Sequence, residues 1–274
     1  MTTQTLARTP PKPSAARRTG RGALAVLRPL RGLAPLAVLL LLWQLLGNRN
    51  SPYFPVPSQW ASALVHDAES GVLGDAVVLT VVSFLVALVL AVVIGGVIGV
   101  AVGSSQRADA AFNPLIQFLR AIPAAAIVPA ATLLLGTGDA TAVAIVVFTS
   151  VWPVIIATRS AVHALNPLLL DVSATLHLSR GARLRKLLLP SLISPVLLGA
   201  RVTAPIALLI TLLVELLTGT TGIGGLLATA QQQFLSATAY GYVVIAAVLS
   251  LLVNAGLHGI DAWAKRYAPR TTDH

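Results

Sequence analysis

The chain has 274 residues, of which 56% are hydrophobic and 10% charged, and its mean hydropathy is +0.83. A soluble domain carries about a quarter charged residues, so this composition excludes a water-soluble globular protein. The absence of cysteine excludes disulfides, thiolate metal sites and cysteine nucleophiles. The chain carries 19 Lys and Arg against 9 Asp and Glu. In a membrane protein we expect this excess to set the topology rather than to bind nucleic acid.

The first segment, residues 1–31, is basic and poor in apolar residues, so we expect a disordered tail there. The apolar run Leu33 to Gly47 that follows is short and could imitate the hydrophobic part of a signal peptide. No convincing A-x-A cleavage site comes after it, so we expect an uncleaved first helix. We then expect one membrane domain over residues 32–268 and a short tail over residues 269–274.

Five more apolar segments follow, each near the ~20 residues that a helix needs to cross a bilayer. Backbone groups in lipid must be satisfied internally, and no strand-length alternation is present, so these segments are expected to be helices. We therefore predict an all-α membrane protein with six transmembrane helices. The five segments are residues 77–103, 115–135, 140–157, 192–217 and 241–260.

Lysine and arginine are distributed unevenly between the predicted loops. Only Arg49 lies clearly in an outside segment if the N-terminus is inside, whereas Arg120 and Arg201 fall in the first turns of the third and fifth helices, close to the inside. The positive-inside rule therefore predicts that both termini are cytoplasmic. The predicted inside segments are the N-terminal tail and residues 104–114, 158–190 and 261–274.

The longest inside loop, residues 158–190, has the most informative pattern. Residues from about Pro167 to Leu178 have helical apolar spacing, and a basic cluster and an apolar run follow, ending at Pro190, which suits the entry to a helix. A short amphipathic helix at this surface could dock into a groove on another protein. It could equally be a connector that lies on the lipid headgroups.

This loop resembles the EAA motif of binding-protein-dependent ABC transport permeases, in which a short helix couples to the ATPase subunit. Asp171 takes the position of the motif's Glu, and Pro190 follows Leu189 where the family has its Leu-Pro pair. The resemblance implies that the ATPase-coupling residues are Asp171, Val172, Ser173, Ala174, His177, Gly181 and Pro190.

The loop also departs from the family pattern. Val172 and Ser173 stand at the two Ala positions, and His177 stands where the family has Gly, with the nearest glycine at Gly181. A residue with a Cβ disfavours a positive φ, so the turn after the motif is expected to differ from the family's. We therefore expect a dedicated ATPase partner rather than an interchangeable one.

The resemblance extends over roughly residues 50–268. It includes the segments FPVPSQWASAL, FLRAIPAAAIVPAATLLLGTGDA and VELLTGTTGIGGLL. These segments are similar to the branch that contains permeases for alkanesulfonates, taurine and nitrate. The resemblance implies the type I ABC importer architecture in a bacterial cytoplasmic membrane, with two permease copies, expected to be identical, around one pathway. An extracytoplasmic binding protein would deliver the solute, and a pair of ATPase subunits would bind ATP and magnesium.

The chain itself shows no catalytic or cofactor signature. It has no G-x-x-x-x-G-K-[ST] sequence, so it is not by itself a P-loop ATPase. Its five histidines include no pair with metal-binding spacing. A self-contained secondary transporter should show paired ionisable residues at mid-membrane, and an intramembrane enzyme should show a nucleophile and a base there. Neither pattern is present in the predicted spans.

Prolines and glycines mark two of the predicted helices. Pro123 and Pro129 fall in the third helix, where each removes a hydrogen bond; the resulting break could line a pathway or could be a packing kink. Gly95, Gly99 and Gly103 repeat every four residues in the second helix and allow close approach of another helix. That neighbour could belong to the same subunit or to a second copy.

Glu215 is the ionisable residue of greatest interest. It follows Arg201 by 14 residues, which places it about 21 Å along the fifth helix, toward its outer end. An ionisable group at depth is a functional-site hypothesis, and we expect a gate or structural role, because its charge would repel an anionic substrate. Alternatively, the carboxylate reaches the outer headgroups or caps the following turn.

Overall fold

The structure is a computed structural model that describes residues 28–165, 175–176, 179–183, 185–186 and 189–267. It divides into two units, residues 1–47 and residues 48–274. In the first unit, helix α2 spans Arg28–Leu46 and is apolar from Ala34 to Leu46. The predicted first helix is therefore present, but its apolar stretch is shorter than the ~20 residues that cross a hydrocarbon core.

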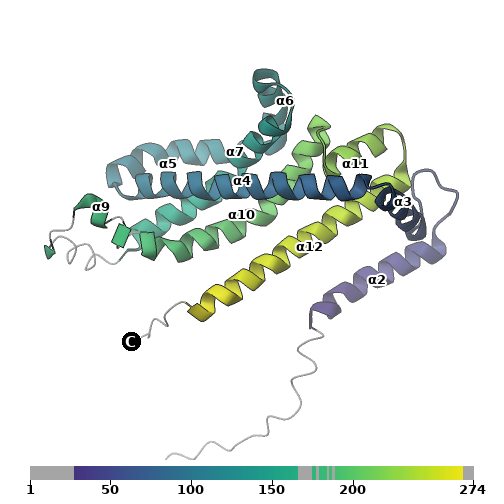
Figure 1. The fold of residues 1–274 in the computed structure, drawn as a ribbon, viewed down its shortest axis with the longest axis horizontal. Coiled ribbons are helices and arrows are strands. Elements are labelled where there is room, and N and C mark those ends of the chain that lie inside the picture. The colour runs from purple at the N-terminus through teal and green to yellow at the C-terminus, as the bar shows by residue number, and fades with distance from the viewer. Residues whose placement is uncertain (1–27, 166–174, 177–178, 184, 187–188, 268–274) are drawn as a thin grey trace, which may run out of the picture. The chain divides into compact units, whose positions relative to one another are not determined.

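All the regular secondary structure in the described residues of the second unit is helical, which confirms the all-α prediction for this part of the chain (Figure 1). By length and composition, four of its helices could cross a membrane: α4, α7, α10 and residues 236–257 of α12. The helices are α3 (Pro57–Glu69), α4 (Val72–Gly103), α5 (Gln106–Arg120), α6 (Ala124–Leu135), α7 (Asp139–His163), α9 (Arg180–Arg183), α10 (Leu189–Thr218), α11 (Ile223–Gln232) and α12 (Ser236–Tyr267).

The predicted third helix is in fact two helices, α5 and α6, which meet at an angle of 92°. Pro123 is the residue before α6, with extended backbone angles, rather than a residue inside a helix as predicted. Proline disfavours the helical conformation of the residue before it, so the chain leaves the helix before Pro123. Pro129 lies inside α6 and removes one hydrogen bond there. The bent pair makes a fifth span only if both helices are taken together.

Helix α7 packs against both α4 and α10, and these three helices form the centre of the second unit (Figure 1). The predicted glycine stripe of α4 lies in this interface. A Cβ built on Gly95 would stand 2.8 Å from Val154 Cβ, and one on Gly99 would stand 2.6 Å from Thr158 Cβ. Gly103 meets the backbone of α7 one turn further on. The three glycines therefore bring two helices of the same chain into close contact.

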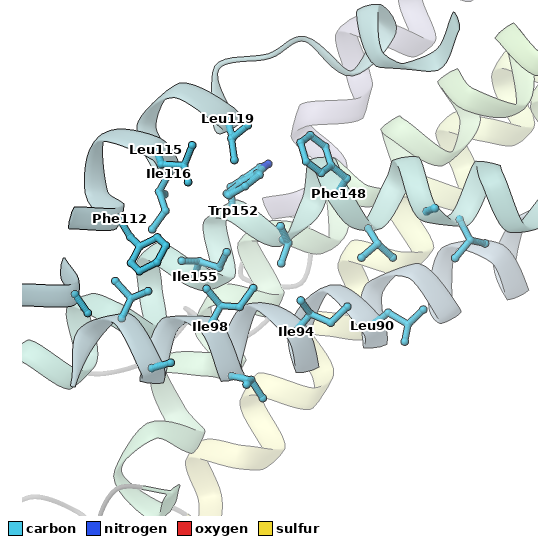
Figure 2. Close-up of a pocket in the computed structure, with 18 of the residues that line it drawn as sticks. Leu90, Ile94, Ile98, Phe112, Leu115, Ile116, Leu119, Phe148, Trp152 and Ile155 are labelled. Atoms are coloured by element: carbon cyan, nitrogen blue, oxygen red, sulfur yellow. The ribbon is translucent and has the colours of Figure 1, made fainter. Parts of the chain in front are cut away.

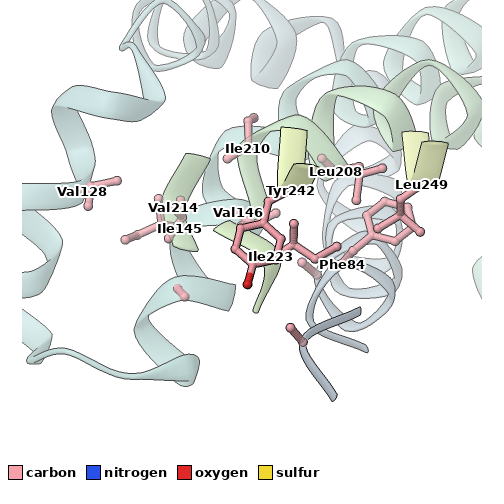
Figure 3. Close-up of a cluster of buried hydrophobic side chains, with 14 of the residues drawn as sticks. Phe84, Val128, Ile145, Val146, Leu208, Ile210, Val214, Ile223, Tyr242 and Leu249 are labelled. Carbon is pink, nitrogen blue, oxygen red and sulfur yellow. The ribbon is translucent and has the colours of Figure 1, made fainter. Parts of the chain in front are cut away.

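A buried apolar core lies where α11 and α12 join these helices (Figure 3). Phe84 of α4, Leu208 of α10 and Ile223 of α11 are almost fully buried in it. Tyr242 of α12 packs into the same cluster, and its hydroxyl donates a 2.8 Å hydrogen bond to Asp67 of α3. The core therefore fixes the first turn of α11 against α4 and α10, beside Glu215.

Candidate functional site

Glu215 lies in the last turn of α10 with its side chain 3% exposed. Burying a carboxylate is unfavourable unless its oxygens accept hydrogen bonds. Glu215 Oε2 accepts two, from Thr80 Oγ1 of α4 at 2.9 Å and from the backbone N–H of Gly224 at 3.0 Å. Thr80 Oγ1 in turn accepts from the N–H of Ile223 at 2.9 Å. One carboxylate therefore joins α10, α4 and the beginning of α11.

The contact with Gly224 places the carboxylate at the N-terminus of α11. The first N–H groups of a helix have no carbonyl partner within it, and the positive end of the helix dipole lies there. Glu215 and Thr80 satisfy two of these N–H groups, those of Gly224 and Ile223. Of the interpretations open from the sequence, the one in which Glu215 caps the following turn matches these contacts. Its burial is incompatible with a side chain that reaches the headgroups.

The glycines of the segment after α10 make room for this carboxylate. Gly222 has a backbone φ of +142°, which residues with a side chain rarely adopt. A Cβ on it would stand 2.5 Å from Glu215 Cδ. A Cβ on Gly224 would collide with the carbonyl oxygen of Leu212. The close approach of α11 to α10 therefore depends on residues without side chains at these positions.

A small polar cavity of about 10 Å³ adjoins Glu215. Glu215 Oε1 is buried and accepts no hydrogen bond from the described residues. The cavity is lined mostly by hydroxyl and carboxylate side chains, and its volume is close to that of about one water molecule. Its polar lining residues are Ser83, Asp139, Thr211, Glu215, Thr220 and Thr221.

The cavity at Glu215 includes Asp139, the first residue of α7, and a second polar cluster lies near the last residue of that helix. Arg159 Nε is 2.9 Å from Asp109 Oδ1, and Arg159 Nη1 donates a 2.7 Å hydrogen bond to Asn113 Oδ1. His163 Nε2 lies 3.8 Å from Asp109 Oδ2. Arg159 and Asp109 are 18% and 20% exposed, so the ion pair is only partly screened by solvent. This cluster ties α5 to the last turn of α7.

The sequence did not identify Asp109 and Asn113 as site residues. Their spacing of four residues is a usable signal, because it places both on one face of a helix. The predicted loop began at residue 158, but α7 continues to His163 and carries Arg159 within its last turns. This stretch contains Arg159, Ser160 and His163, so its composition alone did not show that the helix continues through it.

The predicted coupling residues are only partly described. Gly181 lies in the short helix α9 and is exposed. Pro190 is the second residue of α10, where the fixed φ of proline favours a helix start. Asp171, Val172, Ser173, Ala174 and His177 lie outside the described residues.

A large groove of about 890 Å³ lies between α4, α5 and α7 (Figure 2). Phe112 and Leu115 of α5 face Ile94 and Ile98 of α4 across it, with Trp152 of α7 at one side. Apart from the indole nitrogen of Trp152, its lining side chains have no polar group. The groove therefore suits hydrocarbon and offers almost nothing to recognise a polar solute.

Within the described part of the chain, no group of three or more His, Cys, Asp or Glu residues could hold a metal ion. The polar contacts of these residues include the buried hydrogen bonds at Glu215, the ion pair at Arg159 and the hydrogen bond from Tyr242 to Asp67. Such an arrangement can join and orient helices.

Comparison with known proteins gives a consistent set of relatives. A family model described as "Binding-protein-dependent transport system inner membrane component" matches residues 91–270. The chain is 24% identical over 228 residues to the putative aliphatic sulfonates transport permease protein of Bacillus subtilis, covering 82% of this chain and 83% of that protein. It is 26% identical over 240 residues to a nitrate import permease protein of Synechocystis sp., covering 84% of each chain. It is 32% identical over 158 residues to a bicarbonate transport system permease protein of Synechocystis sp., covering 57% of this chain and 56% of that one.

Proposed function

The chain belongs to the family of binding-protein-dependent transport system inner membrane components, and from this premise we propose that it forms the translocation pathway of an ABC importer for a small anion. It is a multi-pass membrane subunit of an ABC transporter and not the catalytic subunit. The nature of the relatives supports the substrate class. Sulfonates, nitrate and bicarbonate are all small anions with negatively charged oxygens.

In the proposed transporter, two copies of this permease surround one pathway. A binding protein on the outer side delivers the solute, and a separate pair of ATPase subunits binds ATP and magnesium. We propose six spans with both termini cytoplasmic, residues 32–268 as the membrane domain, and tails over residues 1–31 and 269–274. The excess of Lys and Arg in the inside segments supports this orientation.

The loop between α7 and α10 is the proposed contact with the ATPase. The position of the ion pair at its beginning supports this role. Arg159 lies one turn before the end of α7 and binds Asp109 of α5, so the end of α7 is tied to the bent helix pair. A displacement of the loop would therefore be transmitted to α5 through a charged contact as well as through apolar packing. Such coupling requires that the ATP-bound and ATP-free partners favour different arrangements of the permease.

We propose Glu215, with its partners Thr80 and Gly224, as a gate or hinge at the end of the helices that lies away from the loop between α7 and α10. Its carboxylate holds the first turn of α11 against α4 and α10. A rearrangement that moved α11 would have to break these bonds together.

Co-purification and transport test the proposal directly. The permease is purified in mild detergent with ATPase and binding-protein candidates from the same genome, then reconstituted in vesicles. We expect a stable complex and ATP-dependent uptake of one or more of a sulfonate, nitrate, bicarbonate and taurine. Uptake without ATP, driven by a proton or sodium gradient, would instead support a self-contained secondary transporter.

A further inference from the structure

Arg120 lies at the bend of the broken helix pair, as the last residue of α5. It lines a groove of about 460 Å³ whose other walls come from α7 and α10. The groove is separate from the small cavity at Glu215 and contains no acidic residue in its lining. The lining residues that matter here are Arg120, Thr149, Trp152, Pro153, Leu198 and Val202.

The groove extends from the middle of two membrane-length helices, α7 and α10, toward the end of α7 and the start of α10. Thr149 is ten residues after the first residue of α7, which places it about 15 Å along a helix of 25 residues. Val202 of α10 is 13 residues after the start of a helix of 30 residues. The sequence placed Arg120 in the first turn of the third helix, whereas in the structure it is the last residue of α5 and shares this groove with α7 and α10.

An arginine beside membrane-spanning helices is expensive to expose to lipid, so such residues face a water-filled cavity or a partner group. Arg120 is exposed, and the ion pairs of the described residues involve Arg159 and His163 but not Arg120. No hydrogen bond within the described part of the chain engages its guanidinium either. Its charge is therefore not neutralised by any group in the described part of the chain.

The donors in the groove match an oxyanion. A guanidinium presents several N–H groups in one plane and binds two oxygens of a carboxylate-like anion at once. Trp152 also lines the groove, and its indole N–H, a donor only, makes no hydrogen bond within the described part of the chain. The Thr149 hydroxyl already donates to the carbonyls of Ile145 and Val146, at 2.8 and 3.1 Å.

We propose that Arg120, together with the indole of Trp152, forms an anion-recognition site in the translocation pathway, which takes a small oxyanion such as a sulfonate, nitrate or bicarbonate. The inference rests on the proposed importer function and assigns its charge selectivity to named residues of the permease. The guanidinium offsets the unfavourable transfer of the anion's charge into the membrane, and release follows when the groove opens to the other side.

The test compares Arg120→Gln and Arg120→Lys with Arg107→Gln in the reconstituted complex at saturating loaded binding protein. Arg107 is an exposed arginine in the first turn of the same helix and outside the groove, so it is the matched control. Loss of a charge-assisted hydrogen bond should lower anion uptake about tenfold or more. We expect this fall in Arg120→Gln, a smaller one in Arg120→Lys and none in Arg107→Gln. ATP hydrolysis stimulated by the binding protein should persist, so that fewer anions are imported per ATP.

The outcomes separate the two proposals. Wild-type anion import per ATP in Arg120→Gln, or ATP-driven import of neutral solutes only, overturns the anion site while the permease function stands. Absence of any ATP-driven import by the wild-type complex overturns the importer function, and the site with it. Should Arg120→Gln fail to assemble, Trp152→Phe decides, because it removes one N–H and keeps an aromatic ring. A several-fold fall in import per ATP supports the site, and an unchanged ratio contradicts it.

Discussion

The two polar junctions of this permease use opposite designs. At Glu215, a buried carboxylate is held by a hydroxyl and the N-terminus of α11, in a space that only glycines leave open. At Arg159, a partly exposed ion pair joins α5 to the end of α7. Buried hydrogen bonds lose much when one partner is removed, whereas a partly solvated ion pair contributes little to stability. The junction around α11 is therefore expected to be rigid, and the one beside the loop between α7 and α10 adjustable.

The largest effect is expected at Gly222. In Gly222→Ala, an unfavourable φ and a Cβ 2.5 Å from Glu215 Cδ combine, and we expect a loss of about 3 kcal/mol or more in stability. Thermal unfolding in detergent measures it. Gly74→Ala is the control, because nothing lies within 4 Å of a Cβ there. Equal melting temperatures for the two variants would show that α11 is not rigidly held.

The next effect tests whether the α4–α7 interface is equally rigid. A Cβ in Gly99→Ala would stand 2.6 Å from Thr158 Cβ and 2.9 Å from a backbone oxygen of α7, so the helices must separate. Overpacking of this kind costs about 2 kcal/mol. Gly96→Ala, on an open face of the same helix, should keep wild-type stability. A similar melting temperature for both variants would place the interface among the adjustable regions.

Two replacements of Glu215 distinguish its role as a hydrogen-bond acceptor at the start of α11 from the role of its negative charge. Glu215→Ala leaves the N–H of Gly224 unpaired in a buried site, and we expect a loss of about 2 kcal/mol. Glu215→Gln keeps an acceptor for that N–H and should be more stable than the alanine variant. We expect Glu215→Gln to lower uptake while the ATPase subunits still assemble. Wild-type uptake in this variant would remove the gating role and leave a structural cap.

The smallest effect on stability is expected at the ion pair. Asp109→Asn should change unfolding by less than about 1 kcal/mol, because the pair is partly solvated. We nevertheless expect less uptake per ATP hydrolysed if this contact transmits movement from the loop. The exchanged pair Asp109→Arg with Arg159→Asp should recover part of the coupling. Unchanged coupling in Asp109→Asn would assign transmission to apolar packing alone.

The sequence predicted the helix class and the approximate limits of most apolar segments, and one of its alternatives, a Glu215 carboxylate that caps the following turn, matches the structure. It also predicted the helix entry at Pro190, which lies second in α10. It placed Pro123 inside a helix, since the apolar run from Leu115 to Leu135 continues across the bend. An apolar run shows that a segment suits the membrane but not where a helix within it ends. Here the restriction that Pro123 imposes on the residue before it ends α5.

Composition and local spacing determined that this chain is a helical membrane protein, because burial in lipid requires apolar residues and internally satisfied backbone groups. Only the tertiary structure decided what its polar residues do. Glu215 and Thr80 are 135 residues apart, and their hydrogen bond depends on how α4 and α10 pack. Likewise, the position of Arg120 in a groove beside α7 and α10 depends on the bend between α5 and α6. Contacts between distant segments depend on the angle between one helix and the next. The spacing of residues along the chain does not specify that angle.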